Sequence, residues 1–302
     1  MRVSHTPLFF VVLSVALYSV PYGAHAQPVE YGTSAVAFVD TAGTPDGPNS
    51  DLNLEGTFAA AHAESGDAVA DARVRIDSVS CLSEITDLVD SDALTYDAFL
   101  WDTFSVTSES VSNGTPTTVS FLLGLDAALT ASSSDPLVDI ADVWASMIVG
   151  VYDAILTDGV PTEGPDLFVG TADLDAVSGL VPGDDLAAAP FTVEAVSGGF
   201  TATLSDFTIP IDVPTTVGSD LSVKLSVETG ASVAPLLTDG IAIADLRNSL
   251  RILAIDTEEG IELTRASGAM IPPVPLQVTP VLVTVLPTVG FIRFARRSRT
   301  VA

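Results

Sequence analysis

The stretch from Thr118 to Leu129, TVSFLLGLDAAL, decides the fold class of this chain. Every second residue in it is apolar: Val119, Phe121, Leu123, Leu125, Ala127 and Leu129. Side chains alternate between the two faces of a β-strand, so this period of two predicts a strand with one face packed and the other wet. Residues Leu221 to Glu228 show the same alternation. Half-buried strands of this kind are typical of antiparallel sheets.

Shorter apolar segments separated by turn residues extend this pattern over the body of the chain. Strands are expected at 34–39, 52–60, 68–80, 99–107, 142–152, 191–196, 200–205, 207–213 and 241–244, with turns at Pro45-Asp46-Gly47-Pro48, Asn113-Gly114, Pro182-Gly183-Asp184, Ser197-Gly198-Gly199 and Glu259-Gly260. This spacing predicts an all-β, mainly antiparallel, jelly-roll-like β-sandwich. Weak 3.6-residue periodicity in 82–97 and 171–189 predicts one or two short helices on a sheet edge. The pattern leaves 247–255 open between strand and helix.

The first 26 residues have the layout of an export signal. Arg2 supplies a positive charge, and an apolar run from Leu8 to Val20 is too short for a stable membrane span. Ala24 and Ala26 are the small residues that signal peptidase needs, which predicts a signal helix cleaved before Gln27. An uncleaved N-terminal anchor is the alternative.

The segment 271–302 reads as a membrane-directed tail. No charge occurs between Val274 and Ile292, and four arginines follow directly: Arg293, Arg296, Arg297 and Arg299. Arginines beside an apolar segment stay on the cytoplasmic side, so the tail is expected to act as a stop-transfer signal that leaves the body outside. Pro280 and Pro287 interrupt a helix there, which favours a temporary span. A final buried strand with a basic end is the competing interpretation.

Together these features resemble bacterial exported proteins of the PEP-CTERM type, which an exosortase sorts to the cell surface. The resemblance lies in the leader, the proline-containing junction around Pro273 and Pro275, the apolar segment and the arginine-rich end. Three body segments share it: Asn113-Gly114-Thr115-Pro116, 244–250 and 260–268. No Pro-Glu-Pro occurs, and Pro273-Val274-Pro275-Leu276 stands nearest to it. The resemblance implies a β-sandwich body and a transpeptidase-like sorting enzyme as partner.

Charge sets the body, residues 27–270, apart from most proteins. It holds all 39 acidic residues of the chain and six basic ones, Arg73, Arg75, Lys224, Arg247, Arg251 and Arg265, which gives a net charge of −33. Such a surface repels phosphate backbones and argues against nucleic acid as a partner. Many carboxylates beside a single lysine favour a saline habitat, where salt screens self-repulsion. An acidic secreted protein without salt adaptation is the alternative.

Few residues of the body suit catalysis. Cys81 is the only cysteine, so no intramolecular disulfide forms and a buried, inert thiol is expected. His62 is the only histidine after the leader and reads as a structural or surface residue. No Gly-x-Ser-x-Gly, P-loop or zinc-ligand spacing occurs. Trp101 and Trp144 could stack on sugar rings if exposed, although their apolar context favours the core.

Carboxylates are the only abundant side chains in the body that could bind a metal ion or act in catalysis. Three groups could each help to hold Ca²⁺, which takes six to eight oxygen ligands: Asp46 with Asn49 and Asp51, Asp87 with Asp90 and Asp92, and Asp135 with Asp139 and Asp142. No EF-hand loop is present, and no cofactor other than Ca²⁺ is expected. Two carboxylates could also serve a glycosidase.

The sequence therefore predicts a non-enzymatic exported protein of the cell surface or extracellular matrix, with one domain over 27–270. A seam at 157–165 or 181–190 would divide that domain in two. A carbohydrate- or calcium-binding adhesion module, with surface glycans as partners, is the alternative, and a glycoside-active enzyme comes third.

Overall fold

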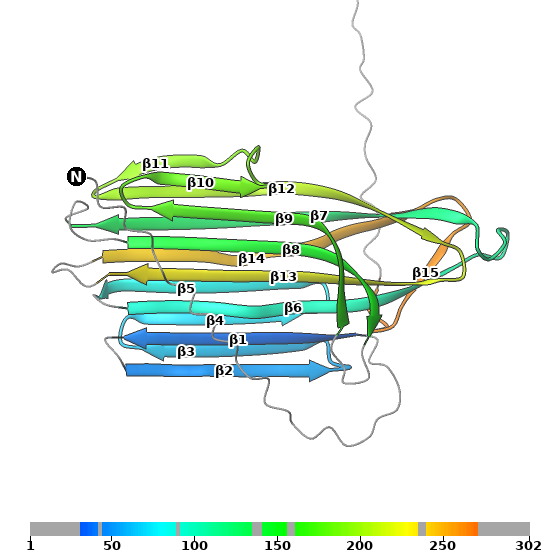
Figure 1. Cartoon of the computed structure of the whole chain (residues 1–302), viewed down its shortest axis with the longest axis horizontal. Helices are drawn as coiled ribbons and strands as arrows, with labels where there is room; N and C mark the ends of the chain where they lie inside the picture. Colours follow the sequence, from blue (N-terminus) through cyan, green and yellow to red (C-terminus); the bar gives the residue numbers. More distant parts are fainter. Residues whose placement is uncertain are drawn as a thin grey trace, which may run out of the picture.

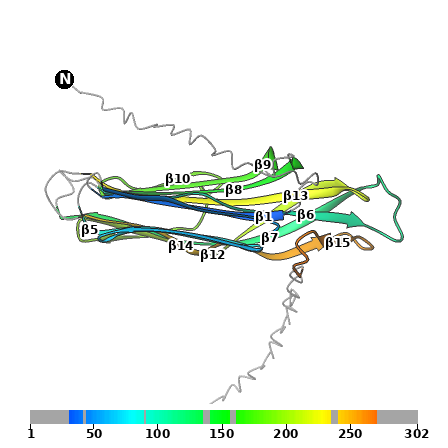
Figure 2. The same ribbon diagram turned by 90° about the horizontal axis from the view of Figure 1, so that it is seen from below.

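The computed structural model describes residues 31–41, 44–88, 91–134, 141–155, 161–234 and 240–270 as two antiparallel sheets packed face to face (Figures 1 and 2). The chain is thus a β-sandwich, as predicted. The signal helix and cleavage site of 1–26 and the tail of 271–302 lie outside the described residues. Within those residues, no helix has the length and apolarity needed to cross a membrane.

Sheet A, drawn above sheet B in Figure 2, has the strand order β10-β9-β8-β13-β6-β1-β2, and β15 pairs with β6 beyond the end of β1. Its strands are β1 (Tyr31–Thr41), β2 (Thr44–Leu54), β6 (Ser91–Thr107), β8 (Ala141–Ile155), β9 (Pro161–Asp175), β10 (Gly179–Asp184), β13 (Asp220–Val233) and β15 (Glu262–Arg265).

Sheet B has the order β11-β12-β7-β14-β5-β4-β3. Its strands are β3 (Phe58–Ser65), β4 (Ala68–Arg75), β5 (Ser78–Leu88), β7 (Pro116–Ser133), β11 (Thr192–Val196), β12 (Gly199–Thr216) and β14 (Gly240–Thr257). Residues 118–129 lie in β7, and their six alternating apolar side chains are all buried.

The jelly-roll prediction is confirmed by the pairing of eight central strands. Counting along the chain from β5, and leaving out β10 and β11, the first strand pairs with the eighth (β5 with β14), the second with the seventh (β6 with β13), the third with the sixth (β7 with β12) and the fourth with the fifth (β8 with β9). This nested pairing is one long antiparallel hairpin rolled into two sheets. Strands β1–β4 widen both sheets on one side, and β10 and β11 widen them on the other.

A single cluster of buried apolar side chains fills the space between the sheets. Near β1, β3 and β4 it consists mainly of alanine, with Ala35 and Ala37 facing Ala59, Ala61 and Ala63. Small side chains allow the two sheets to approach closely at this edge. Larger residues such as Phe104, Phe121 and Leu125 occupy the centre.

The predicted short helices are wrong. Residues 82–88 belong to β5 and 91–97 to β6, while 171–184 belong to β9, a turn and β10, and 185–189 form a further turn. In β9 the apolar residues Ala172 and Leu174 point inward while Thr171 and Asp173 point outward, a period of two that a helical interpretation overlooks. Pairing with central strands decides the conformation here, because strand preference depends mostly on cross-strand neighbours.

Two predicted turns also need correction. Pro45-Asp46-Gly47-Pro48 lies within β2, and Pro182-Gly183-Asp184 lies within β10. Both strands are at sheet edges, where proline removes no ladder hydrogen bond. The turns at Asn113-Gly114, Ser197-Gly198-Gly199 and Glu259-Gly260 are confirmed, and 247–255 is part of β14.

Candidate functional site on the outer face of sheet A

Trp144 lies on the outer face of sheet A. Its neighbours Val143 and Ala145 on β8 are buried in the core, so the indole between them points away from it. The indole covers Gly230 of β13, the residue opposite in register, where a Cβ would stand 2.2 Å from Nε1. The side chain is half-buried, so the sheet supports the indole while part of it faces solvent. The predicted core position of Trp144 is therefore wrong.

Trp101 repeats this arrangement on β6 but is covered. Its ring lies over Gly32 of β1, where a Cβ would stand 2.3 Å from the ring, and its centroid is 5.7 Å from that of Phe99. The residue is only 1% exposed, yet it is not part of the core cluster between the sheets. Trp101 is thus buried, as predicted, but it lies outside the core cluster between the two sheets. Of the two tryptophans, Trp144 is the one accessible to a ligand.

Carboxylates surround Trp144 on the same face. Asp173 of β9 is its register partner, and Asp142 stands two residues before it on β8. Burial, and then the charges of Asp173 and Asp175, raises the pKa of Asp142 to about 6. Burial also raises the pKa of Asp173. Asp142 is thus about half-protonated near pH 6, and a protonated carboxyl can both donate and accept hydrogen bonds.

A row of polar residues crosses the sheet beside this tryptophan. The register pairs Asp40 with Asp92, Asp92 with Ser232, Ser232 with Asp142, and Asp142 with Asp175. Asp175 is already engaged, because its Oδ1 accepts hydrogen bonds from the backbone N–H groups of Val177 and Ser178 at 2.6 and 2.7 Å. One oxygen of Asp40 is buried and has no hydrogen-bond partner within the described part of the chain.

An indole that is partly exposed and has carboxylates beside it can bind a sugar ring. A flat indole offers a surface for the apolar face of a pyranose, and oxygen-bearing side chains at its rim can bind the hydroxyl groups. Sequence reasoning considered the tryptophan and Asp142 but missed Asp173 and Asp175. The alternation Thr171-Ala172-Asp173-Leu174-Asp175 was the signal that could have found them, since it places both carboxylates on one strand face.

The predicted calcium ligands on β2 form hydrogen bonds with the backbone of β3. Asp46 Oδ2 accepts a hydrogen bond of 2.9 Å from the N–H of Glu64, and Asp51 Oδ2 accepts one of 3.0 Å from that of Ala60. Two amides alternate with them: Asn49 donates to the carbonyl of His62 at 2.7 Å, and Asn53 donates to that of Phe58 at 2.8 Å. These four side chains, the edge ladder, join the edge strands β2 of sheet A and β3 of sheet B.

Of the remaining calcium candidates, the structure describes the side chains of two, Asp92 and Asp142. Asp90, Asp135 and Asp139 lie outside the described residues, as does the side chain of Asp87, while Asp92 and Asp142 belong to the polar row of sheet A. Among the residues that the structure describes, no three His, Cys, Asp or Glu side chains are grouped so as to hold a metal ion. Calcium binding stays a prediction, which calorimetric titration with Ca²⁺ would test.

Cys81 is buried, as predicted. Its Sγ lies 3.5 Å from the carbonyl oxygen of Val227, and burial raises the pKa of the thiol to about 12. The thiolate that would be nucleophilic is therefore strongly disfavoured. His62 is exposed on β3, with Nε2 at 3.4 Å from Glu64 Oε2.

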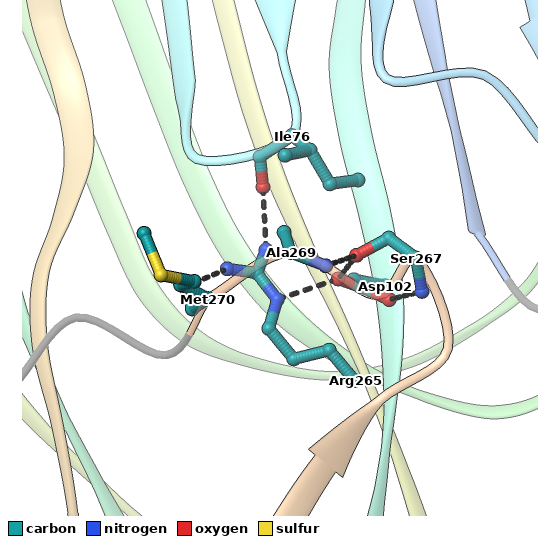
Figure 3. A network of polar contacts seen from close by, with 6 residues as sticks. All are labelled: Ile76, Asp102, Arg265, Ser267, Ala269 and Met270. Carbon is teal, nitrogen blue, oxygen red and sulfur yellow. Dashed lines mark hydrogen bonds and ion pairs between the residues drawn. The ribbon is translucent and has the colours of Figure 1, made fainter.

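The sequence did not predict one polar cluster of the structure. It consists of Arg265, Asp102 and Ser267 and is called the clasp (Figure 3). Asp102 accepts hydrogen bonds from Nε of Arg265 at 2.8 Å and from the hydroxyl of Ser267 at 2.7 Å. Arg265 also donates to the carbonyl of Ile76 at 2.7 Å, and its guanidinium lies 5.4 Å from the ring of Phe104. The clasp fastens the segment after β15 to β6 and to the β4–β5 turn of sheet B.

Comparison of the chain with protein-family models, with curated proteins and with solved structures found no match in any of the three.

Proposed function

We propose that this chain is a non-enzymatic, exported protein of the cell surface or extracellular matrix that binds glycans through the outer face of sheet A. The position of Trp144 carries the glycan part of the proposal. Its indole lies on the outside of the sheet over Gly230, and Asp173 and Asp142 stand at its rim. A large aromatic side chain held on a sheet surface gains less burial there than in the core, so a ligand that covers it accounts for its location.

Export and surface display rest on the leader and the tail. A leader with a cleavage site after Ala26 directs the chain across the membrane, and the apolar segment with Arg293 and its neighbours retains the C-terminal end there, at least temporarily. The clasp supports this arrangement, because any pull on the chain beyond Met270 would be transmitted to β6 and to the β4–β5 turn.

A glycan array tests the binding function. The full-length chain is expected to bind a restricted set of neutral glycans, and Trp144→Ala is expected to abolish that binding because the stacking surface is removed. Asp173→Asn is expected to weaken it. Phe58→Ala is the matched control, since Phe58 is 47% exposed on β3 of the other sheet. Equal glycan profiles for Trp144→Ala and the unaltered chain would refute the proposal.

Surface display is tested in the native cells. Mass spectrometry of the mature protein is expected to find Gln27 at its N-terminus and processing within 271–302. Recovery of the intact polypeptide from the cytosol, with leader and arginines present, would rule out export.

A further inference from the structure

Four of the six basic residues of the body line one depression on the outer face of sheet B. It measures about 300 Å³ and is lined by Arg73 and Arg75 of β4, Arg247 and Arg251 of β14, and Ser78, Val79 and Ser80 of β5. Among the residues that the structure describes, no carboxylate lines it. Since the body carries a net charge of −33, this gathering of arginines is the strongest departure from its general charge pattern.

The register of three strands explains the hollow. Arg75 pairs with Ser78, and Ser78 pairs with Arg251, so two long side chains flank a short one. Because β5 lies between them, the Cα atoms of Arg75 and Arg251 stand about 10 Å apart. Arg73 pairs with Ser80 in the next row, and the register of β14 shifts between Leu246 and Leu250, next to Arg247. Serines thus form the floor and arginines the walls.

Carboxylates outside the lining compensate part of this positive charge. Arg73 pairs with Asp71 at 2.9 Å, Arg251 pairs with Asp126 at 3.1 Å, and Arg247 holds Asp245 through Nε and Nη2. No ion pair of Arg75 occurs among the described residues, and its side chain is exposed. The guanidinium groups on β4 and β14 face each other across β5 and repel each other, so an oxyanion placed between them would relieve that repulsion.

We propose that this depression binds the carboxylate or sulfate groups of an anionic polysaccharide. The guanidinium fork matches both groups and donates two parallel hydrogen bonds to either. A thin polymer chain with about one charge per sugar can enter the depression with few contacts to the surrounding acidic surface. A second copy of this chain would bring its own large negative charge, and double-stranded DNA carries one charge per ~1.7 Å, so the body repels both more strongly. The site lies on the sheet opposite Trp144 and is independent of the proposed glycan face.

Titration calorimetry of the full-length chain tests the proposal with three probes: polygalacturonate, dextran sulfate and neutral dextran. Salt of about 0.3 M shortens the screening length to about 6 Å, which limits repulsion by the rest of the body. The chain is expected to bind at least one charged polymer and not neutral dextran. Preference for polygalacturonate assigns the site to carboxylates, and preference for dextran sulfate assigns it to sulfates.

Substitutions then locate the site. Arg75→Gln is expected to weaken binding about fivefold and Arg75→Gln with Arg247→Gln more than about tenfold, because charge-assisted hydrogen bonds are lost. Arg75→Gln disturbs no ion pair, so it stays informative if the double variant fails to fold. Thr192→Glu on β11 makes the same change in net charge far from the depression and is expected to leave binding unchanged, as is Trp144→Ala.

Three results would overturn the proposal: neither charged polymer binds, Arg75→Gln binds as well as the unaltered chain, or Thr192→Glu weakens binding as much as Arg75→Gln. Loss of neutral-glycan binding in Trp144→Ala, with polyanion binding retained, would separate this site from the glycan face.

Discussion

Asp102 Oδ2 accepts a 2.8 Å hydrogen bond from Nε of Arg265, although the two residues are 163 positions apart and both side chains are 1% exposed. Burying two charges is costly unless the pair is fully hydrogen-bonded. Here Ser267 and the carbonyl of Ile76 complete the set of partners. The clasp thus joins the C-terminal segment to both sheets.

Asp102→Asn is expected to lower the free energy of unfolding by about 3 kcal/mol, because it leaves the guanidinium of Arg265 buried without a counter-charge. Asp126→Asn is the control, since it breaks an Asp–Arg pair whose arginine side chain is 42% exposed. Exposed pairs contribute less than about 1 kcal/mol. Urea denaturation measures both values, and equal losses would contradict the role of the clasp.

Asp51→Ala is expected to destabilise the protein by about 1 kcal/mol, because it removes one hydrogen bond of the edge ladder. The amide N–H of Ala60, which donates a hydrogen bond to Asp51, should then exchange its proton faster with solvent. Asp67→Ala removes the same charge from the exposed β3–β4 turn and should change neither quantity. Hydrogen exchange followed by NMR makes the comparison, and unchanged protection of Ala60 in Asp51→Ala would argue against the ladder.

Asp142 should make stability depend on pH between about 4 and 6. Its pKa in the folded state is raised to about 6 from the ordinary 3.8. The folded protein therefore binds more protons than the unfolded chain in this range, so this contribution to stability falls as pH rises. Asp142→Asn is expected to stabilise the protein at pH 7 by about 1 kcal/mol after solvent screening, and to have little effect at pH 4. Urea denaturation of both proteins makes the comparison. If their midpoints differed by the same amount at pH 4 as at pH 7, this prediction would be contradicted.

Salt is expected to stabilise the fold. Between 0.05 and 3 M NaCl the free energy of unfolding should rise, with most of the gain below about 1 M, where the screening length has fallen to about 3 Å. Thermal unfolding across this range provides the measurement. A melting temperature indifferent to NaCl would remove the inference of a saline habitat.

The sequence predicted the strands of the sandwich because the alternation that marks a strand is local, whereas the nested pairing of the jelly roll joins strands far apart in the chain. Every second residue of β7 from Val119 to Ala131, and of β13 from Leu221 to Val233, is buried. The turn between β6 and β7 at Asn113-Gly114 and the β11–β12 hairpin turn at Gly198 follow from residues that tolerate the required backbone. Gly198, for example, has φ of 76°, and a Cβ there would stand 1.9 Å from the carbonyl oxygen of Ser133.

The sites could not be predicted in the same way because they depend on register. Trp144 has apolar neighbours on both sides, and only the burial of Val143 and Ala145 between the sheets shows that the indole lies on the outer face. The four arginines of the depression lie as far apart as 73 and 251, and β5 brings them together. Asp46 and Asp51 looked like cation ligands because the sequence does not show that β3 passes beside them.

The most direct test of the glycan-binding face uses the two tryptophans of the chain, Trp101 and Trp144. In the ¹⁵N-labelled protein they give two indole N–H resonances, which Trp144→Phe assigns. Titration with a neutral glycan selected on the array is expected to shift the Trp144 resonance and leave that of the covered Trp101 in place. A bound glycan that moves neither resonance, or only that of Trp101, would contradict the account.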